Sequence, residues 1–253
     1  MPTSPDPSAS FDDATRALYA AFADVAHRPN LARCRHCVTD SDVAALAGAV
    51  TTLPAPSISR FLAKAGTTWG DGEDLRRVAP RALHLAADRQ LTFGRQVLLE
   101  KLANAGWSTW PPAQVDAICR FLLAEWTRLI ASPPRPAHCA HGWLSQTATV
   151  VSDLTPFLKA WESMLVTQPG PPALHLAVVI VQSDLRPDFP DSVSALFQEP
   201  ATAEAFGAWL AGSPVSSGLE AASRALATTA DARRLTLAVD RLARFRSART
   251  RTV

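Results

Sequence analysis

The stretch Val115-Asp-Ala-Ile-Cys-Arg-Phe-Leu-Leu-Ala-Glu-Trp-Thr-Arg-Leu-Ile130 decides the fold class of this 253-residue chain. Its large apolar side chains recur at intervals of three and four residues, at positions 115, 118, 122, 126, 129 and 130. Because an α-helix completes a turn in about 3.6 residues, this spacing places them on one face. The stretch is therefore predicted to form an amphipathic helix that buries this face against other helices.

The same helical period recurs along the rest of the chain. Runs of β-branched residues, which strands favour, occur at 147–151 and 178–181, and the second belongs to an apolar segment typical of a buried helix. We therefore expect an all-α fold, either an antiparallel helical bundle or an irregular HEAT-like array of helix pairs. Further helices are predicted over residues 14–25, 41–50, 57–65, 73–88, 93–105, 154–165, 173–184, 202–211, 216–229 and 231–246.

Proline-rich segments and the chain ends mark the predicted domain boundaries. The proline joint at 132–136 divides the main domain into two alternative halves, 10–132 and 141–246, because proline ends a helix. Pro80 lies inside another predicted helix and is expected to kink it or to divide it into two. The predicted organisation is a disordered lead over 1–9, a single all-α domain over 10–246 and a basic tail over 247–253.

Composition and charge narrow the classes of function. Hydrophobic residues make up 47% and charged residues 19%, which is typical of a globular protein. The formal net charge of +2 is too close to neutral for nucleic acid to be the main partner. The longest apolar run, 176–181, is far shorter than the ~20 residues of a membrane helix, and no secretory signal is found. We expect a cytoplasmic protein without a membrane partner, and the excess of arginine over lysine indicates a bacterial source.

The most distinctive local motif is Cys34-Arg-His-Cys37. Two thiolates at this spacing form half of a typical zinc site, which needs two more ligands. The other cluster of suitable side chains is His138-Cys139-Ala-His141. The candidate ligands for zinc, the one cofactor considered, are therefore Cys34, Cys37, Cys139, His138 and His141.

The same two cysteines also fit a redox pair. Pairs of the thioredoxin type lie just before a helix N-terminus, where the helix dipole lowers the thiol pKa. A helix capped by Thr39, Asp40 or Ser41 is predicted shortly after Cys37, but no strand precedes the motif. Ordinary thiols in a packed loop are the third alternative.

Two groups of residues are candidate contacts for a partner protein. Trp107 and Trp110 precede the strongest helix and either anchor an interface or fill the gap between helix ends and core. Arg244, Arg246 and Arg249 belong to a basic C-terminal segment that either touches an acidic surface or is simply solvated. Apart from Phe245, no aromatic residue alternates with these arginines, so nucleic-acid binding is not expected.

Three carboxylates gather at Asp71, Glu73 and Asp74, just before a predicted helix. The segment lacks the alternating ligands of a calcium-binding EF-hand loop. We therefore expect these acids to cap the helix and to interact with its dipole.

Catalytic signatures are missing from the sequence. It contains no glycine-rich phosphate loop, no Gly-x-Ser-x-Gly elbow and no His-Glu-x-x-His pair. No residue is therefore assigned a catalytic role, and a protein that is not an enzyme is favoured.

Several segments of the first half of the chain support a resemblance. They are Cys34–Cys37, Leu46, Phe61, the run Asp74-Leu-Arg-Arg-Val-Ala-Pro-Arg81, and the region from Leu102-Ala-Asn-Ala-Gly-Trp107 to Trp126. In these segments the chain resembles uncharacterised helical proteins of bacteria. The resemblance implies no known activity, and no site residue is carried over from it.

Together these features favour a non-enzymatic helical accessory module that binds another protein through a helix face or groove. The first alternative is a defence-system or toxin-neutralising protein of the immunity type. The second is a zinc-binding or redox protein centred on Cys34 and Cys37.

Overall fold

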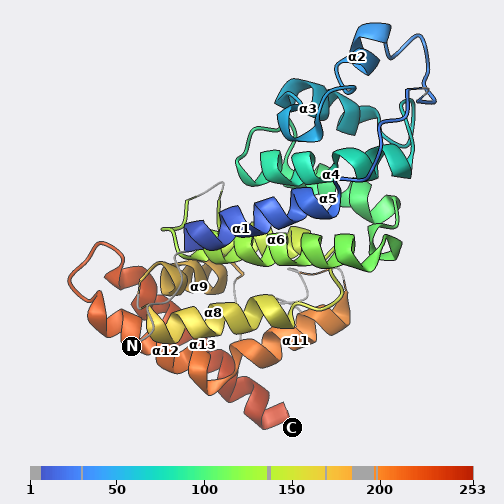
Figure 1. The fold of residues 1–253 in the computed structure, drawn as a ribbon. Helices are drawn as coiled ribbons and strands as arrows, with labels where there is room; N and C mark the ends of the chain where they lie inside the picture. The colour runs from blue at the N-terminus through green and yellow to red at the C-terminus, as the bar shows by residue number, and fades with distance from the viewer. Residues whose placement is uncertain are drawn as a thin grey trace. The chain divides into compact units, whose positions relative to one another are not determined.

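The fold is all-helical, as the sequence predicts. In the computed structural model, the part of the chain that is described forms helices and no strand, and its β-type pairing is confined to three isolated bridges. The chain divides into two compact units, Met1–Glu125 and Trp126–Val253 (Figure 1). The structure describes residues 7–29, 31–135, 138–168, 170–183, 197 and 199–252, without the side chains of 7–9, 251 and 252.

Unit 1 is organised around one long helix, α4 (Gly72–Ala87), which packs against α1, α3, α5 and a short 3-10 helix. Its residues Leu75, Val78, Ala82 and Leu83 recur at helical spacing and are buried. The other elements of unit 1 are α1 (Pro7–Ala21), α2 (Asp40–Ala44), η1 (Val50–Thr52), α3 (Ala55–Lys64), α5 (Arg95–Asn104), η2 (Trp107–Thr109) and most of α6 (Pro112–Ile130).

The acidic segment caps α4, which confirms the capping prediction. The Asp71 carboxylate accepts hydrogen bonds from the amides of Glu73 at 2.9 Å and Asp74 at 3.3 Å. In return, the Asp74 carboxylate accepts the amide of Asp71 at 3.0 Å. This reciprocal arrangement is a capping box, which satisfies amides that have no partner inside the helix.

Helix α4 continues through Pro80 without a break. The alternative of two short helices is therefore wrong. Proline removes one amide donor from the helix, but here its ring is buried, as are its neighbours Ala79 and Leu83. Burial of this apolar face offsets the lost hydrogen bond.

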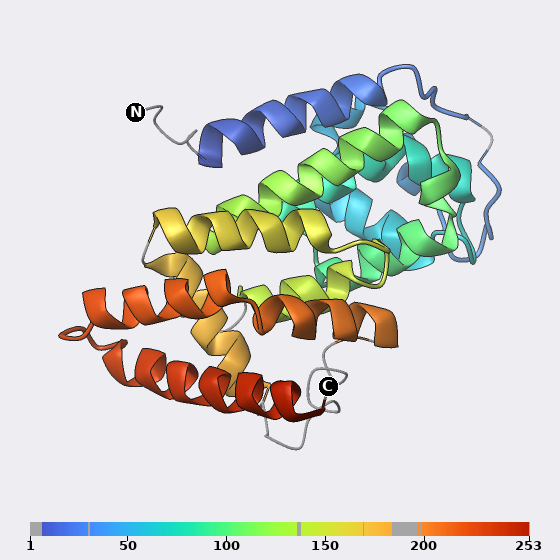
Figure 2. The same ribbon diagram turned by 90° about the horizontal axis from the view of Figure 1, so that it is seen from below.

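Unit 2 is organised around α9 (Pro171–Gln182), which packs against α7, α8, α12 and α13. The apolar run 178–181 lies in this helix, as expected. Figure 2 shows α12 and α13 side by side. The other helices of unit 2 are α7 (Ala140–Thr147), α8 (Thr155–Thr167), α11 (Pro200–Leu210), α12 (Ser213–Ala225), α13 (Ala232–Thr252) and the end of α6.

Tryptophan rings form the centre of unit 2. The ring of Trp126 lies 4.9 Å from that of Trp143 and 5.1 Å from that of Trp161. The buried indole nitrogens of two of these rings are satisfied by backbone carbonyls, since Trp126 donates to Phe157 at 2.9 Å and Trp161 donates to Pro172 at 3.0 Å. Trp126 and Trp161 thus bury apolar area while their polar atoms keep a hydrogen bond.

The structure departs from the sequence expectations at several ends of elements. The sequence did not predict α7, whose Gly142 and position after a proline joint weaken the local helical signal. Residues 1–6 of the predicted lead lie outside the described residues, and α1 already begins at Pro7. Helix α13 continues through the segment assigned to the basic tail as far as Thr252. Within the described ranges, no helix is both long and apolar enough to cross a membrane.

Candidate dithiol site

Cys34 and Cys37 lie on one tight turn of unit 1, and both are free thiols. The amides of Cys37 and Val38 both donate to the Cys34 carbonyl at 3.0 Å, which closes the turn. Cys34 is exposed, and Cys37 is partly buried. The turn therefore presents one sulfur to solvent and keeps the second next to it.

A second segment of unit 1, residues 68–70, holds this turn in place. The Cys34 amide donates to the Thr68 carbonyl at 2.8 Å. A second hydrogen bond joins the same two segments: Gly70, two residues after Thr68, donates its amide to the carbonyl of Ala32, two residues before Cys34, at 2.7 Å. The backbone that carries the exposed thiol is thus paired with a segment more than thirty positions later in the sequence.

The pairing segment is itself anchored in the core by Trp69. This residue forms an isolated antiparallel bridge with Arg33, and only 1% of its surface is exposed. Its ring lies 5.3 Å from that of Phe61, in an edge-to-face arrangement. Gly70 follows with φ of 64°, a conformation that favours glycine, and a Cβ there would lie 2.8 Å from an oxygen of Asp74. The tight turn after Trp69 therefore requires glycine.

The chain before the turn is tied to the start of α4. Arg28 donates from Nε and Nη2 to the two oxygens of Asp74, at 2.9 and 2.6 Å. Its Nη2 also donates to Asp71 at 2.5 Å. The Asp74 side chain is only 5% exposed, so this ion pair fixes the loop at a largely desolvated point.

Helix α3 brings a positive charge to the two thiols. Lys64, its last residue, donates from Nζ to the carbonyl of Cys37. His36 lies between the cysteines, with its Nδ1 3.9 Å from the Cys37 sulfur. Lys64 thus places one positive charge near the two thiols, and His36 contacts the Cys37 sulfur.

The electrostatic environment makes the two thiols unequal. Backbone amides of Cys37 and His36 donate to the Cys34 sulfur and lower the pKa of this thiol, and the charge of Lys64 lowers it further. The hydrogen bond with Cys34 instead raises the pKa of Cys37. Because the thiolate is the nucleophile, Cys34 is the more reactive sulfur at neutral pH.

The helix after the motif contributes little to this activation. Thr39, one of the three predicted caps, is the N-cap of α2, and its hydroxyl accepts the amide of Asp42 at 3.2 Å. However, α2 spans only five residues, Asp40–Ala44, so it carries only a small dipole. Local amides, rather than a helix dipole, favour the Cys34 thiolate.

The predicted zinc ligands fall into both units. Cys34 and Cys37 belong to unit 1, whereas Cys139, His138 and His141 belong to unit 2. The second group lies at the start of α7, where Cys139 is the N-cap, and burial lowers the pKa of His141. Among the described residues, no three or more histidine, cysteine or acidic side chains gather closely enough to hold a metal ion. The zinc site that would join the two groups stays a prediction.

The two tryptophans offered as partner contacts are inside unit 1. Trp107 is 5% exposed and Trp110 is 8% exposed, and the Trp110 ring packs edge-to-face on Phe22 at 6.0 Å. Their use as exposed contacts is therefore corrected to packing, because a ring buried in the core is not available to a partner. They fill the space between helix ends, which was the alternative interpretation.

The arginines of the C-terminal segment lie on α13, and two of the three have partners within unit 2. Arg246 donates to the hydroxyl of Ser216 at 2.5 Å, and Arg249 pairs with Glu204 of α11. Of the three, only Arg244 is exposed, whereas Arg246 and Arg249 are half-buried. Arg246 and Arg249 therefore help to hold α13 against its neighbours, and Glu204 offsets the charge of Arg249.

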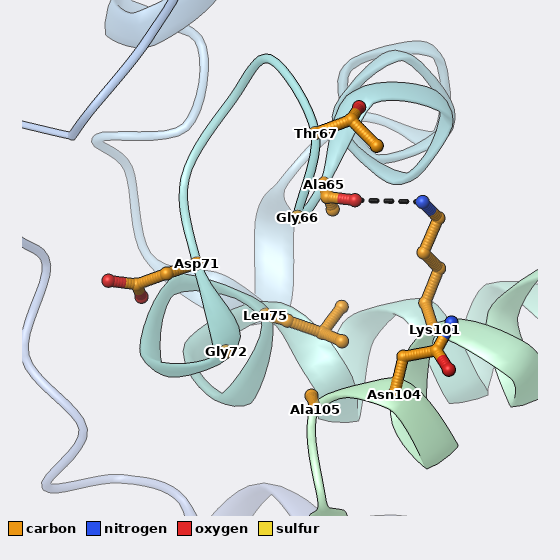
Figure 3. Close-up of a pocket in the computed structure, with 9 residues that line it drawn as sticks. All are labelled: Ala65, Gly66, Thr67, Asp71, Gly72, Leu75, Lys101, Asn104 and Ala105. Atoms are coloured by element: carbon orange, nitrogen blue, oxygen red, sulfur yellow. Dashed lines mark hydrogen bonds between the residues drawn. The ribbon is translucent and has the colours of Figure 1, made fainter.

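Unit 1 also contains a pocket of about 200 Å³ between the loop 65–67, the start of α4 and the end of α5 (Figure 3). Lys101 extends across it and donates to the Ala65 carbonyl at 2.8 Å. Leu75 points into the pocket, whereas the Asp71 carboxylate points away from it. The lining offers no nucleophile with an adjacent base, so we assign no chemistry to it.

Sequence patterns identified the two cysteines but not the residues that position them. Lys64 and Thr68 are remote from the cysteines in the sequence, Arg28 lies six positions before Cys34, and none of the three follows a motif. The acids at positions 71, 73 and 74 indicate only a helix cap. Comparison of the chain with protein-family models, with curated proteins and with solved structures finds no match.

Proposed function

We propose that the protein exchanges disulfides, using Cys34 as the attacking sulfur and Cys37 as the resolving sulfur. One observation supports this proposal above all: a single anchored turn holds an exposed thiol with a lowered pKa and, three residues later, a second and partly buried thiol. Two thiols are sufficient for this chemistry, whereas a structural zinc site needs four ligands.

The reaction transfers two electrons from the dithiol to a partner disulfide. The Cys34 thiolate attacks one sulfur of the partner, the partner S–S bond breaks, and the leaving thiolate is protonated by solvent. Cys37 then loses its proton to solvent and attacks the Cys34 sulfur, which expels the second partner thiolate. The partner disulfide is reduced to two thiols, and Cys34 and Cys37 become a disulfide that a second dithiol must reduce.

The partner in this reaction is another protein that carries a disulfide, which agrees with the prediction of a protein partner. The contact between the two proteins would be brief. The broader interaction-module and immunity-type hypotheses stay predictions. Among the described residues, the large exposed apolar side chains are Phe93 in the loop before α5, Val166 in α8 and Leu237 in α13.

The test uses the reduced full-length chain and an excess of a small symmetrical disulfide such as 2-hydroxyethyl disulfide. Mass spectrometry should find a Cys34–Cys37 disulfide in the wild type. Cys37→Ser should accumulate a mixed disulfide at Cys34, and Cys34→Ser should form neither product. Cys119→Ser, which removes a partly buried thiol of α6, is the matched control and should behave like the wild type.

Two results would overturn the proposal. The first is a Cys34→Ser variant that still oxidises Cys37 at the wild-type rate. The second is native protein that retains about one zinc per chain and whose Cys34 resists disulfides until the metal is removed, because such protein uses the thiols as metal ligands.

A further inference from the structure

A groove of about 510 Å³ in unit 1 is lined by side chains of the segment that carries Cys34, although Cys34 itself is not among its lining residues. Two of its lining residues, Arg33 and Arg35, are the direct neighbours of Cys34 in the sequence. Their charges act on a substrate at the Cys34 sulfur through the electrostatic field, which exposed charges exert over about 10 Å at 0.1 M salt. The lining consists of two arginines, one acid and apolar residues, among them Arg33, Arg35, Asp40, Pro29, Leu31 and Val43.

The charges of this groove do not cancel. Arg33 pairs through Nη2 with Asp40, the one acid of the lining, and donates from Nη1 to the Thr39 carbonyl at 3.3 Å. Arg35 is exposed and forms no ion pair within the ranges that the structure describes. The groove thus retains one positive charge from Arg35, the residue that follows Cys34 in the sequence, and Lys64 adds positive potential at Cys34.

We infer that this groove selects acidic disulfide substrates, namely peptides with a carboxylate beside the reacting cystine. The inference rests on the proposed disulfide exchange and names its substrate class. A carboxylate is attracted to Arg35 and increases the rate of productive encounter, whereas a lysine at the same place is repelled. The apolar side chains of Leu31 and Val43 provide a surface for the backbone and the cystine methylenes.

The experiment compares three symmetrical disulfides that differ at one position. The peptides are Ac-Glu-Cys-Gly-NH2, Ac-Gln-Cys-Gly-NH2 and Ac-Lys-Cys-Gly-NH2, each oxidised to its disulfide. Second-order rate constants for reaction with the reduced full-length protein are measured at low and at high salt. The readout is the ratio of the glutamate rate to the glutamine rate, because any change in the intrinsic reactivity of Cys34 affects both peptides alike.

The wild type should favour the glutamate peptide by roughly threefold to tenfold at low salt and disfavour the lysine peptide, in line with electrostatic steering. The preference should shrink at about 0.5 M salt, where exposed charges are screened. Arg35→Gln should bring the ratio close to one, and Arg35→Glu should invert it. Arg16→Gln, an exposed arginine on α1 that does not line the groove, is the control and should keep the wild-type ratio.

The two proposals fail in distinguishable ways. Equal rates for all three peptides, with a Cys34–Cys37 disulfide as the product, would overturn the acidic substrate class and leave disulfide exchange standing. A preference that survives Arg35→Glu would also overturn it, because the charge would then come from elsewhere. If no peptide oxidises the cysteine pair faster than it oxidises a free dithiol in solution, disulfide exchange itself is overturned, and the substrate class with it.

Discussion

Arg28 and Asp74 form a two-point ion pair, in which Nε and Nη2 of the guanidinium donate to the two carboxylate oxygens at 2.9 and 2.6 Å. Asp74 also accepts the amide of Asp71 in the capping box of α4. One buried carboxylate therefore stabilises the start of the central helix of unit 1 and anchors the loop that leads to Cys34. Stability and site geometry depend on the same side chain.

Replacement of this carboxylate by an amide should destabilise the protein. Asp74→Asn keeps the shape but turns one acceptor oxygen into a donor, which then faces either Arg28 or the Asp71 amide. We expect a loss of about 2 kcal/mol in the free energy of unfolding, since hydrogen bonds to charged groups contribute this order. Urea unfolding followed by circular dichroism measures it.

The matched control for this prediction is Glu73→Gln, which removes the neighbouring charge at an exposed site. Glu73 is 57% exposed and pairs with Arg76 one helical turn away, so its loss should cost less than about 0.5 kcal/mol. Equal effects of the two substitutions would show that the Arg28–Asp74 pair contributes no more than a surface ion pair.

The reactivity of Cys34 should depend on Lys64. Lys64→Met removes a positive charge that lowers the pKa of the Cys34 thiol, so a smaller fraction is thiolate at pH 7. Alkylation of Cys34 by iodoacetamide should slow by about twofold to fivefold, since its rate follows the thiolate fraction. Lys159→Met, which removes an exposed lysine of α8 in unit 2, is the control. An unchanged rate in Lys64→Met would show that the local amides alone activate Cys34.

The helices were predictable where the pattern is local. The apolar spacing of 115–130 lies within α6 (Pro112–Ile130), and the carboxylates at 71–74 correctly marked the start of α4. Propensity and proline rules predicted the helix boundaries less well where burial outweighs them, and only the division of α4 at Pro80 is contradicted. Pro80 is accommodated in a buried helix face, and α7 forms despite Gly142 because Trp143 and Leu144 are buried.

The candidate site was predictable only in its two cysteines. The Cys-x-x-Cys spacing can be recognised from the sequence alone. The pairing of Cys34 with Thr68 and the contact of Lys64 with Cys37 depend on tertiary folding. No local sequence pattern distinguishes Arg33, whose charge is paired with Asp40, from Arg35, for which the described residues show no ion pair. The unpaired charges around the cysteines could therefore be identified only from the structure.

Acid should destabilise unit 2 through His175, whose side chain is fully buried. Its Nδ1 accepts the Ala140 amide at 3.2 Å, so Nε2 carries the proton and donates to the carbonyls of Ser132 at 2.9 Å and Leu129 at 3.1 Å. The neutral ring fits this site, and burial lowers the pKa of His175 to about 4. Protonation of the ring would remove its acceptor.

The sign of the effect follows from the two pKa values. The unfolded chain binds the His175 proton near pH 6.5 and the folded chain near pH 4, so unfolding takes up a proton between these values. The contribution of neutral His175 to the free energy of unfolding is fully present above pH 6.5. It falls by up to ~1.4 kcal/mol per pH unit toward pH 4, about 3 kcal/mol in all. Urea midpoints measured from pH 4 to pH 7 test this. His175→Gln should be less stable at pH 7 but should have a flatter profile, and parallel profiles would contradict the assignment.

Two glycine substitutions in unit 2 should have opposite effects on stability. Gly218 lies where α12 crosses α8, and a Cβ there would be 3.0 Å from the Leu165 Cβ and 3.3 Å from its carbonyl oxygen. Gly218→Ala should therefore force the helices apart and cost about 1 to 3 kcal/mol. Gly142 lies inside α7 with nothing within 4 Å of the added carbon, so Gly142→Ala should add about 0.5 to 1 kcal/mol through helix propensity.

Urea unfolding of both variants separates packing from propensity, because the added methyl group is the same and both sites are helical. A Gly218→Ala variant as stable as the wild type would mean that α12 can move away from α8 without loss. Such a result would contradict the close packing of these two helices, in which Gly218 lies directly against the backbone of Leu165. The expected pair of opposite shifts instead requires that α12 and α8 be fixed at this contact.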